Sequence, residues 1–342
     1  MTPKLIFSLV FLCFVQILFA QNSPKEVAKK FFDSGVAKSE AEDNYGAISD
    51  FTKAIEMNPK DDKAYYNRGQ INGRIKNYES ALEDYSQAIE INSNSYTSYI
   101  GRGNTKSILK DYSTALQDYT KAIELNPNGE DGYYYRAAVK EILNDNYGAV
   151  VDYSKAIDIN PNNADTYLAF GSLKGKLKDY KNSIGDLTKA IDINPKLSYA
   201  YFKRAFAKEQ IGEVNSALSD YSKVIKLDPT FALAYYNSGQ IRRGLNDFDG
   251  AIEDFTRYIR LNPSDKESYV VRGLAKYSKE DYYGAIADFT SSIEIDPENL
   301  NALLFRANSK FKLGDMLGCC KDYKKLCELG DDRGCKLNNN CN

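Results

Sequence analysis

The 342-residue chain lacks histidine and tryptophan altogether. Without histidine it has neither the side chain that most often serves as a general base near pH 7 nor the commonest metal ligand. Neither sign of charge predominates, because the chain has 45 Lys and Arg residues and 47 Asp and Glu residues. Nucleic-acid binding usually needs a clustered basic face. The composition therefore argues against an enzyme, against a bound metal or cofactor, and against a nucleic-acid partner.

Long apolar runs are also scarce. The run at Leu5–Phe19 follows Lys4 and precedes Ala20, which is the plan of a secretory signal peptide cleaved after Ala20. With about 15 apolar residues it is shorter than the roughly 20 that a membrane-spanning helix needs. We therefore expect residues 1–20 to be a signal peptide and residues 21–27 to be a linker. The mature chain is then exported to the periplasm, the cell envelope or the medium, without a transmembrane segment.

What the sequence has in abundance is a repeat of 34 residues. Asn-Pro or Asp-Pro recurs at this interval or at twice it, at Pro59, Pro127, Pro161, Pro195, Pro229, Pro263 and Pro297. A fixed period over most of a chain is typical of a repeat array. Nine units fit, called repeats 1 to 9 below, at residues 28–61, 62–95, 96–129, 130–163, 164–197, 198–231, 232–265, 266–299 and 300–333. A short segment at residues 334–342 follows them.

Each repeat contains two segments of about 13 residues in which apolar residues recur every three or four positions, which predicts two amphipathic helices. Proline after the second segment ends it. The first helices share a row of small residues, Gly35, Gly69, Gly103, Ala137, Gly171, Ala205, Gly239, Gly273 and Ala307. The second helices share another, Ala47, Ala81, Ala115, Ala149, Ser183, Ala217, Ala251, Ala285 and Cys319. We expect the two rows to meet where the helices cross, beside a core of second-helix aromatics from Phe51 to Tyr323.

These rows resemble the tetratricopeptide repeat, whose first helix carries an aromatic and then a small residue, and whose second helix carries Ala, an aromatic and Ala. The matching residues in repeat 2 are Ala64, Tyr65, Gly69, Tyr78, Ala81, Tyr85 and Ala88. Those in repeat 3 are Tyr99, Gly103, Tyr112, Ala115, Tyr119, Ala122 and Pro127. The resemblance implies an all-α, right-handed superhelix of about nine helix-turn-helix repeats with a concave groove lined mainly by first helices. It also implies a protein or peptide ligand rather than catalysis.

Charged residues recur with the same period. Every repeat has an aspartate at one position, namely Asp50, Asp84, Asp118, Asp152, Asp186, Asp220, Asp254, Asp288 and Asp322. First helices carry a basic row, Lys38, Lys106, Lys140, Lys174, Lys208, Arg242, Lys276 and Lys310. An arginine row lies four positions earlier on the same helix face, at Arg68, Arg102, Arg136, Arg204, Arg272 and Arg306. We interpret these rows as a ladder of ion pairs that fixes the hairpin geometry, with each exposed rung contributing about 0–1 kcal/mol. An ion-binding stripe is the alternative.

In the tetratricopeptide family one face of the first helices lines the groove, and here that face is apolar with flanking amides. The candidate partner-binding residues are Tyr66, Gln70, Ile100, Asn104, Tyr134, Leu168, Phe202, Phe206, Tyr236 and Gln240. Aromatic residues of this kind are common interface hot spots, which suits an exported scaffold or adaptor, with self-association left open. One alternative is that these side chains only fill the groove wall. Another is a glycan- or peptidoglycan-binding module that uses exposed aromatic pairs such as Tyr134 and Tyr135.

Five of the six cysteines lie between Cys319 and Cys341. Cys320 and Cys327 share a face of the last helix, because they are seven residues apart. If the following segment runs antiparallel, it brings Cys335 to Cys327 and Cys341 to Cys320. The run that carries Cys327 and Cys335 also resembles a cysteine-linked Sel1-like repeat, which supports the first pairing. We predict two disulfides that hold a capping helix on the end of the core, with Cys319 a buried thiol. A metal site is the alternative, although its usual close cysteine pairs are missing.

Overall fold

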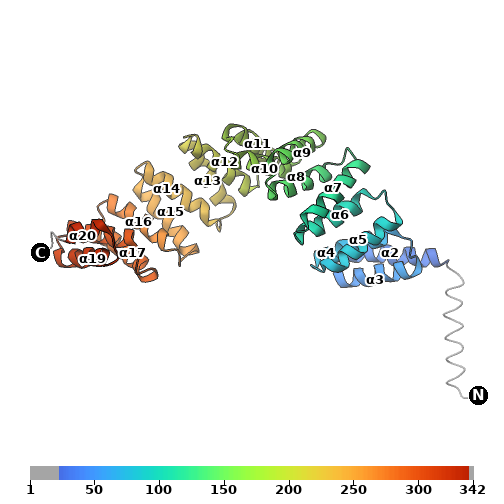
Figure 1. Ribbon diagram of the computed structural model, residues 1–342, viewed down its shortest axis with the longest axis horizontal. Coiled ribbons are helices and arrows are strands. Elements are labelled where there is room, and N and C mark those ends of the chain that lie inside the picture. Colours follow the sequence, from blue (N-terminus) through green and yellow to red (C-terminus); the bar gives the residue numbers. More distant parts are fainter. Residues whose placement is uncertain (1–22, 339–342) are drawn as a thin grey trace, which may run out of the picture. The chain divides into compact units, whose positions relative to one another are not determined.

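The computed structural model describes residues 23–338. The predicted signal peptide and Cys341 lie outside the described residues. Within residues 23–338 the chain forms 19 helices and no strand. Figure 1 shows these helices following one another along the chain. The predicted all-α fold of successive helix pairs is therefore confirmed.

The chain divides into two compact units, one ending at Phe170 and one beginning at Gly171, inside helix α10 (Ala164–Lys176). The first unit contains α2 (Pro24–Glu40), α3 (Asn44–Met57), α4 (Asp62–Arg74), α5 (Tyr78–Ile91), α6 (Tyr96–Ile108), α7 (Tyr112–Leu125), α8 (Glu130–Ile142) and α9 (Asn146–Ile159). The second contains α11 (Tyr180–Ile193), α12 (Ser198–Gln210), α13 (Val214–Leu227), α14 (Ala232–Gly244), α15 (Phe248–Leu261), α16 (Lys266–Ser278), α17 (Tyr282–Ile295), α18 (Leu300–Lys312), α19 (Met316–Glu328) and α20 (Asp332–Asn338).

Within each unit the helices pack in chain order. In the first unit α2 packs on α3, α4 on α5, α6 on α7 and α8 on α9, and each pair packs on the next. First helices of neighbouring repeats also touch, as α4 does with α6 and α6 with α8. In the second unit the corresponding neighbours are α14 with α16 and α16 with α18. This arrangement places the first helices of consecutive repeats side by side.

The start of α2 differs from the prediction. The helix begins at Pro24 rather than at residue 28. The Ser23 side chain accepts a hydrogen bond from the Glu26 amide, and the Glu26 side chain accepts one from the Ser23 amide, at 3.3 and 2.8 Å. Such a capping box satisfies two amides that would otherwise lack partners at a helix start. Residues 24–27, predicted to belong to a linker, are therefore helical.

The turn between the two helices of a repeat contains one residue in the left-handed conformation. This residue has a positive φ in all nine repeats, at Glu42, Lys76, Lys110, Asn144, Lys178, Gly212, Asn246, Glu280 and Gly314. The next residue caps the second helix in most repeats, as Asp111 does by accepting from the Thr114 amide. The left-handed region favours glycine, yet only two of these nine residues are glycine.

The second-helix aromatics form the core, as predicted. The side chains exposed by 2% or less include Phe51, Tyr119, Tyr153, Tyr221, Phe255 and Phe289. The small first-helix residues also approach these rings closely. A Cβ atom added to Gly103 would meet the Tyr119 ring at 2.7 Å, and one added to Gly273 would meet the Phe289 ring at 2.7 Å. The two small-residue rows also meet as predicted in repeat 5, where the Ser183 hydroxyl donates to the Gly171 carbonyl oxygen at 2.7 Å.

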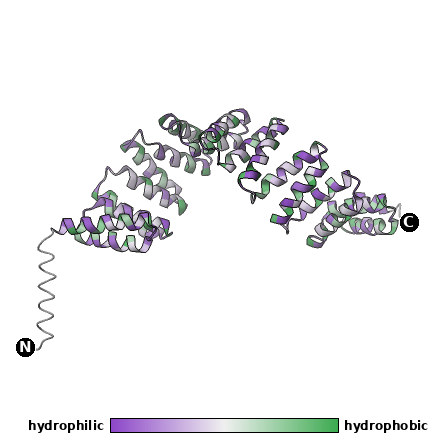
Figure 2. Cartoon of the chain, turned by 180° about the vertical axis from the view of Figure 1, so that it is seen from behind, coloured by the Kyte–Doolittle hydropathy of each residue, from purple (hydrophilic) through white to green (hydrophobic). Residues whose placement is uncertain are grey.

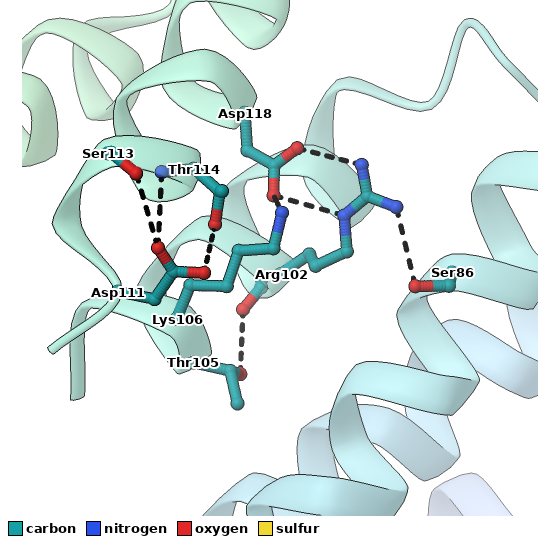
Figure 3. Close-up of polar contacts among 9 residues, drawn as sticks. Ser86, Arg102, Thr105, Lys106, Asp111, Ser113, Thr114 and Asp118 are labelled. Atoms are coloured by element: carbon teal, nitrogen blue, oxygen red, sulfur yellow. Dashed lines mark hydrogen bonds and ion pairs between the residues drawn. The ribbon is translucent and has the colours of Figure 1, made fainter. Parts of the chain in front are cut away.

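The predicted ladder of ion pairs is present, but its aspartates, except Asp186, are buried rather than exposed. Asp118, 4% exposed, accepts hydrogen bonds from Arg102 Nε at 3.0 Å and Nη2 at 2.7 Å, and Lys106 Nζ lies 2.8 Å away (Figure 3). Arg102 Nη1 also donates to Ser86 of the preceding repeat at 3.3 Å. The same link to a preceding Thr hydroxyl recurs at Arg68, Arg136, Arg204, Arg272 and Arg306. The ladder therefore joins consecutive repeats as well as the helices within each.

The predicted capping helix is α20, which packs on α19. A disulfide between Cys327 and Cys335 joins the two helices, and Cys319 is a buried free thiol. The second predicted pairing, between Cys320 and Cys341, involves a residue outside the described part. In residues 23–338 no helix is both long and apolar enough to cross a membrane. Figure 2 shows hydrophilic and hydrophobic residues interspersed along the helices.

Candidate functional site

The first unit contains a cavity of about 440 Å³ on the face built by α4, α6 and the start of α8. Four of the predicted groove residues line it together, namely Tyr66, Gln70, Ile100 and Asn104. Tyr66 and Gln70 lie one helical turn apart on α4, and Ile100 and Asn104 occupy the equivalent places on α6. The 34-residue period therefore brings the same face of two neighbouring first helices to one site.

The floor of the cavity is continuous with the core. Ile100 is 8% exposed and belongs to a cluster with Tyr119. The Asn104 side-chain oxygen accepts a hydrogen bond from the Tyr119 hydroxyl at 2.8 Å. Gln70 donates to the Tyr66 hydroxyl at 2.8 Å. These contacts hold both amide side chains in place, so each presents a defined orientation to a ligand.

The wall formed by α8 carries negative charge. Asp131 lines the cavity and accepts a hydrogen bond from the Tyr96 hydroxyl at 3.5 Å. Burial raises the pKa of Asp131 above its ordinary value, and the adjacent Glu130 charge raises it further. One Glu130 carboxylate oxygen is buried with no hydrogen-bond partner within residues 23–338. Burial and the Asp131 charge raise the pKa of Tyr96 to about 12. The wall therefore favours a positively charged group.

The cationic residue of the cavity lining is Arg74. Its guanidinium donates to the Ser39 carbonyl and to the Asn44 side chain, each at 3.3 Å. These bonds direct the Arg74 charge toward the first repeat rather than toward Asp131. The cavity rim also includes Ile108, which is 57% exposed, so an apolar contact is available beside the polar groups.

The remaining predicted residues of the first unit do not line this cavity. Tyr134 packs against Tyr135 with ring centroids 5.2 Å apart and against Tyr153 at 6.0 Å. Both Tyr134 and Tyr135 are half-buried, so they do not form an open aromatic platform. Tyr135 itself does line the cavity, and it stacks on Tyr119 at 5.9 Å. Leu168 lies on α10, near the end of the unit.

The other predicted residues belong to the second unit. Phe202 packs against Phe231 with ring centroids 4.8 Å apart, and Phe206 is 41% exposed. Gln240 donates to the Tyr236 hydroxyl at 3.1 Å, which repeats the contact between Gln70 and Tyr66. This unit therefore presents the same kind of first-helix face.

Sequence reasoning missed the α8 wall and the aromatic rim. Tyr96 and Asp131 are 35 residues apart, so they are one period and one residue from each other. A search for residue pairs 35 positions apart would have placed the start of each first helix beside the start of the first helix in the preceding repeat. The arrangement offers amides and hydroxyls for a peptide backbone, an apolar floor, and a carboxylate for a cation.

Models of the tetratricopeptide repeat match residues 62–95, 96–128, 164–197, 202–266 and 236–300. Together they cover more than half of the chain. No curated protein matches the sequence. A tetratricopeptide repeat protein from Parabacteroides merdae has a similar structure, with a TM-score of 0.53, 20% identity, and coverage of 73% of this chain and 98% of that one.

Two further solved structures are similar. Pseudomonas aeruginosa pilF has a TM-score of 0.53 at 17% identity and matches 62% of this chain and 97% of its own length. YrrB, described as a tetratricopeptide repeat protein with an unusual peptide-binding site, has a TM-score of 0.46 at 24% identity and matches 55% and 96%. At these identities the structural likeness concerns the fold alone.

Proposed function

The chain belongs to the tetratricopeptide repeat family, and from this premise we propose that it is an exported scaffold that binds an extended segment of another protein. The fold is one used for protein–protein interaction. The site is the cavity between α4, α6 and α8. The observation that carries the proposal is that Gln70, Asn104 and Asp131 meet over an apolar floor in one cavity of about 440 Å³.

The chemistry of the lining favours a segment with a basic residue beside an apolar one. Gln70 and Asn104 can each donate to and accept from a peptide backbone. Asp131 has Glu130 beside it and only the Tyr96 hydroxyl as a hydrogen-bond donor among the described side chains. A lysine or arginine side chain of the ligand would offset that charge. Ile108 provides exposed apolar surface for the neighbouring ligand residue, and burying such a side chain is worth roughly 1.5–3 kcal/mol.

A random peptide library displayed on phage, selected against residues 21–342, tests the proposal. Selected peptides should share a basic and an apolar position, and their affinity is then measured by fluorescence polarisation. We expect Ile108→Glu and Asp131→Lys each to weaken binding at least tenfold. The matched control is Tyr147→Glu, because Tyr147 is 82% exposed and does not line the cavity.

The result distinguishes the possible sites. Loss of binding in Ile108→Glu and Asp131→Lys with retention in Tyr147→Glu supports the cavity. Equal binding by all variants would move the site elsewhere on the chain. Failure to select any peptide, together with retention on a glycan or peptidoglycan matrix, would replace the proposal by carbohydrate binding.

Export is part of the proposal. It is supported by the apolar run at Leu5–Phe19 and by the disulfide between Cys327 and Cys335, because disulfides persist mainly in oxidising compartments. The full chain should be expressed in a bacterial host, the cells fractionated, and the N-terminal residue of the recovered protein determined by mass spectrometry. Recovery outside the cytoplasm with Gln21 at the N-terminus is expected. An intact Met1 in the cytoplasmic fraction would contradict export.

A further inference from the structure

The ladder of ion pairs is interrupted in repeat 7. Ser238 occupies the position held by Arg204 in repeat 6 and by Arg272 in repeat 8. In repeat 6 the Arg204 guanidinium donates to Asp220 from Nε at 2.9 Å and from Nη2 at 2.7 Å. It also donates from Nη1 to Thr188 at 3.0 Å and lies 5.5 Å from the centre of the Tyr201 ring. One guanidinium therefore has three partners: a carboxylate, a hydroxyl and an aromatic face.

All three partners of the missing guanidinium are retained in repeat 7. One period after Thr188, Tyr201 and Asp220 come Ser222, Tyr235 and Asp254. These three residues line a cavity of about 480 Å³. The short Ser238 side chain is 1% exposed and donates to Asp254 Oδ2 at 2.6 Å. The cavity therefore contains the three groups that contact a guanidinium in repeat 6, without an arginine at position 238 to contact them.

The cation that remains beside Asp254 is Arg242, which also lines this cavity. Arg242 Nε lies 3.1 Å from Asp254 Oδ2, and its Nη1 donates to Asp247 at 2.9 Å. Arg242 is therefore equivalent to Lys208 of repeat 6. There Asp220 contacts both Lys208 and Arg204. One aspartate accommodates two cations in the complete repeats, so repeat 7 has room for a second.

A second basic residue, Arg257, lies at the cavity without excluding a further cation, as repeat 6 shows. Arg257 lines the cavity and follows Lys223 by one period. In repeat 6 Lys223 lies 5.9 Å from the centre of the same Tyr201 ring that Arg204 covers. Burial raises the pKa of Asp254, and the Ser238 hydroxyl and the Arg242 charge offset this effect only in part. Among the described residues Asp254 has one ion-pair partner, Arg242, where Asp220 has two, Arg204 and Lys208.

We propose that the cavity beside Ser238 binds the guanidinium group of an arginine side chain supplied by a protein ligand, which would complete the ladder of repeat 7 from outside. The guanidinium would bridge Asp254 Oδ1 and the Ser222 hydroxyl and lie over Tyr235. A planar group with several donors matches this arrangement, whereas a lysine ammonium cannot contact both acceptors and stack on the ring. The site belongs to the second unit and does not depend on the cavity between α4, α6 and α8.

The test uses residues 21–342 and two blocked tripeptides, acetyl-Gly-Arg-Gly-amide and acetyl-Gly-Lys-Gly-amide, with affinities measured by isothermal titration calorimetry. The arginine peptide should bind at least tenfold more tightly than the lysine peptide. Ser238→Arg should abolish binding, because the chain then supplies the guanidinium itself. Arg204→Ser should create a second equivalent site in repeat 6 and raise the stoichiometry from one to two.

One further variant and one further ligand keep the test informative if a variant fails to fold. Ser222→Ala removes one acceptor on an exposed side chain and should weaken binding of the arginine peptide about threefold to tenfold. Methylguanidinium chloride at millimolar concentration tests whether the site takes a peptide or only a small cation. The arginine peptide should bind more tightly than methylguanidinium, and equal affinity would indicate a site for a small cation. Equal affinity for the arginine and lysine peptides, or unchanged binding by folded Ser238→Arg, would overturn the proposal.

Discussion

Arg272 holds Asp288 through two parallel hydrogen bonds, from Nε to Oδ2 at 2.9 Å and from Nη2 to Oδ1 at 2.6 Å. The Asp288 side chain is only 4% exposed, whereas that of Arg272 is 16% exposed. Lys276 supplies a second cation at 2.8 Å, and Thr256 of the preceding repeat accepts a further bond from Arg272 Nη1. A repeat array is stabilised mainly by contacts between neighbours. This ion pair therefore acts at the junction on which the stability of the array depends.

The first prediction concerns this junction. Arg272→Met should lower the free energy of unfolding by about 2–3 kcal/mol, because a buried carboxylate loses its two-point partner and keeps only the lysine. Urea denaturation followed by circular dichroism measures the change. Lys29→Ala is the control, since Lys29 pairs with Asp33 but both side chains are more than half exposed. That variant should be indistinguishable from the parent.

Adding Asp288→Leu to Arg272→Met tests the cause. If the cost arises from an uncompensated buried charge, the double variant should be more stable than Arg272→Met alone, because the charge itself is gone. A double variant that loses as much as the two single substitutions combined would show instead that packing around both side chains sets the cost.

The second prediction concerns the left-handed turns. Lys110 has a φ of +65°, a conformation that costs a residue with a Cβ roughly 1–2 kcal/mol. Lys110→Gly should stabilise the protein by about 0.5–1 kcal/mol, because relief of this strain exceeds the entropy that glycine adds to the unfolded state. Gly212 has a φ of +82°, so Gly212→Ala should destabilise by a similar amount. Thermal denaturation of the three proteins measures both effects, and a loss of stability in Lys110→Gly would contradict the account.

The sequence alone was sufficient for the helix pairs and for the ladder, because both follow directly from rows that recur every 34 residues. It was not sufficient for contacts between one repeat and the next. The bond from Arg102 to Ser86 and the position of Asp131 beside Tyr96 both depend on how the helices of neighbouring repeats rotate against each other. A period specifies which residues are equivalent, but it does not specify which side of a neighbouring helix they meet.

The third prediction concerns the cysteines of the last helices. Paired Cys327→Ser and Cys335→Ser substitutions should lower the free energy of unfolding of α20 by about 2–3 kcal/mol, the value expected for closing a short loop. Hydrogen exchange of the α20 amides measures the loss. Cys319→Ala is the control, because Cys319 is unbridged and alanine occupies the equivalent place at Ala285. Unchanged exchange in the paired variant would show that packing alone retains α20.

The last prediction is a pH dependence at the start of α20. Asp331 accepts hydrogen bonds from Arg333 Nη2 at 2.6 Å and from the amides of Arg333 and Gly334 at 2.9 and 3.2 Å. Chiefly because of the Arg333 side chain, the pKa of Asp331 falls from 3.8 to about 2. A carboxylate with a lowered pKa in the folded state stabilises that state only while it is ionised. Its contribution is therefore complete above the unfolded value and is lost as the pH falls toward 2.

Hydrogen exchange at the Arg333 and Gly334 amides, measured between pH 2 and 6 and corrected for intrinsic rates, should show protection that declines below about pH 4. Asp331→Asn should remove most of this decline, because the side chain no longer titrates, and should lower protection at pH 6. Asp332→Asn is the matched control on the neighbouring exposed carboxylate and should keep the parent profile. A parent profile that is flat down to pH 2, or one that Asp332→Asn flattens as much as Asp331→Asn does, would show that Asp331 does not hold the start of α20.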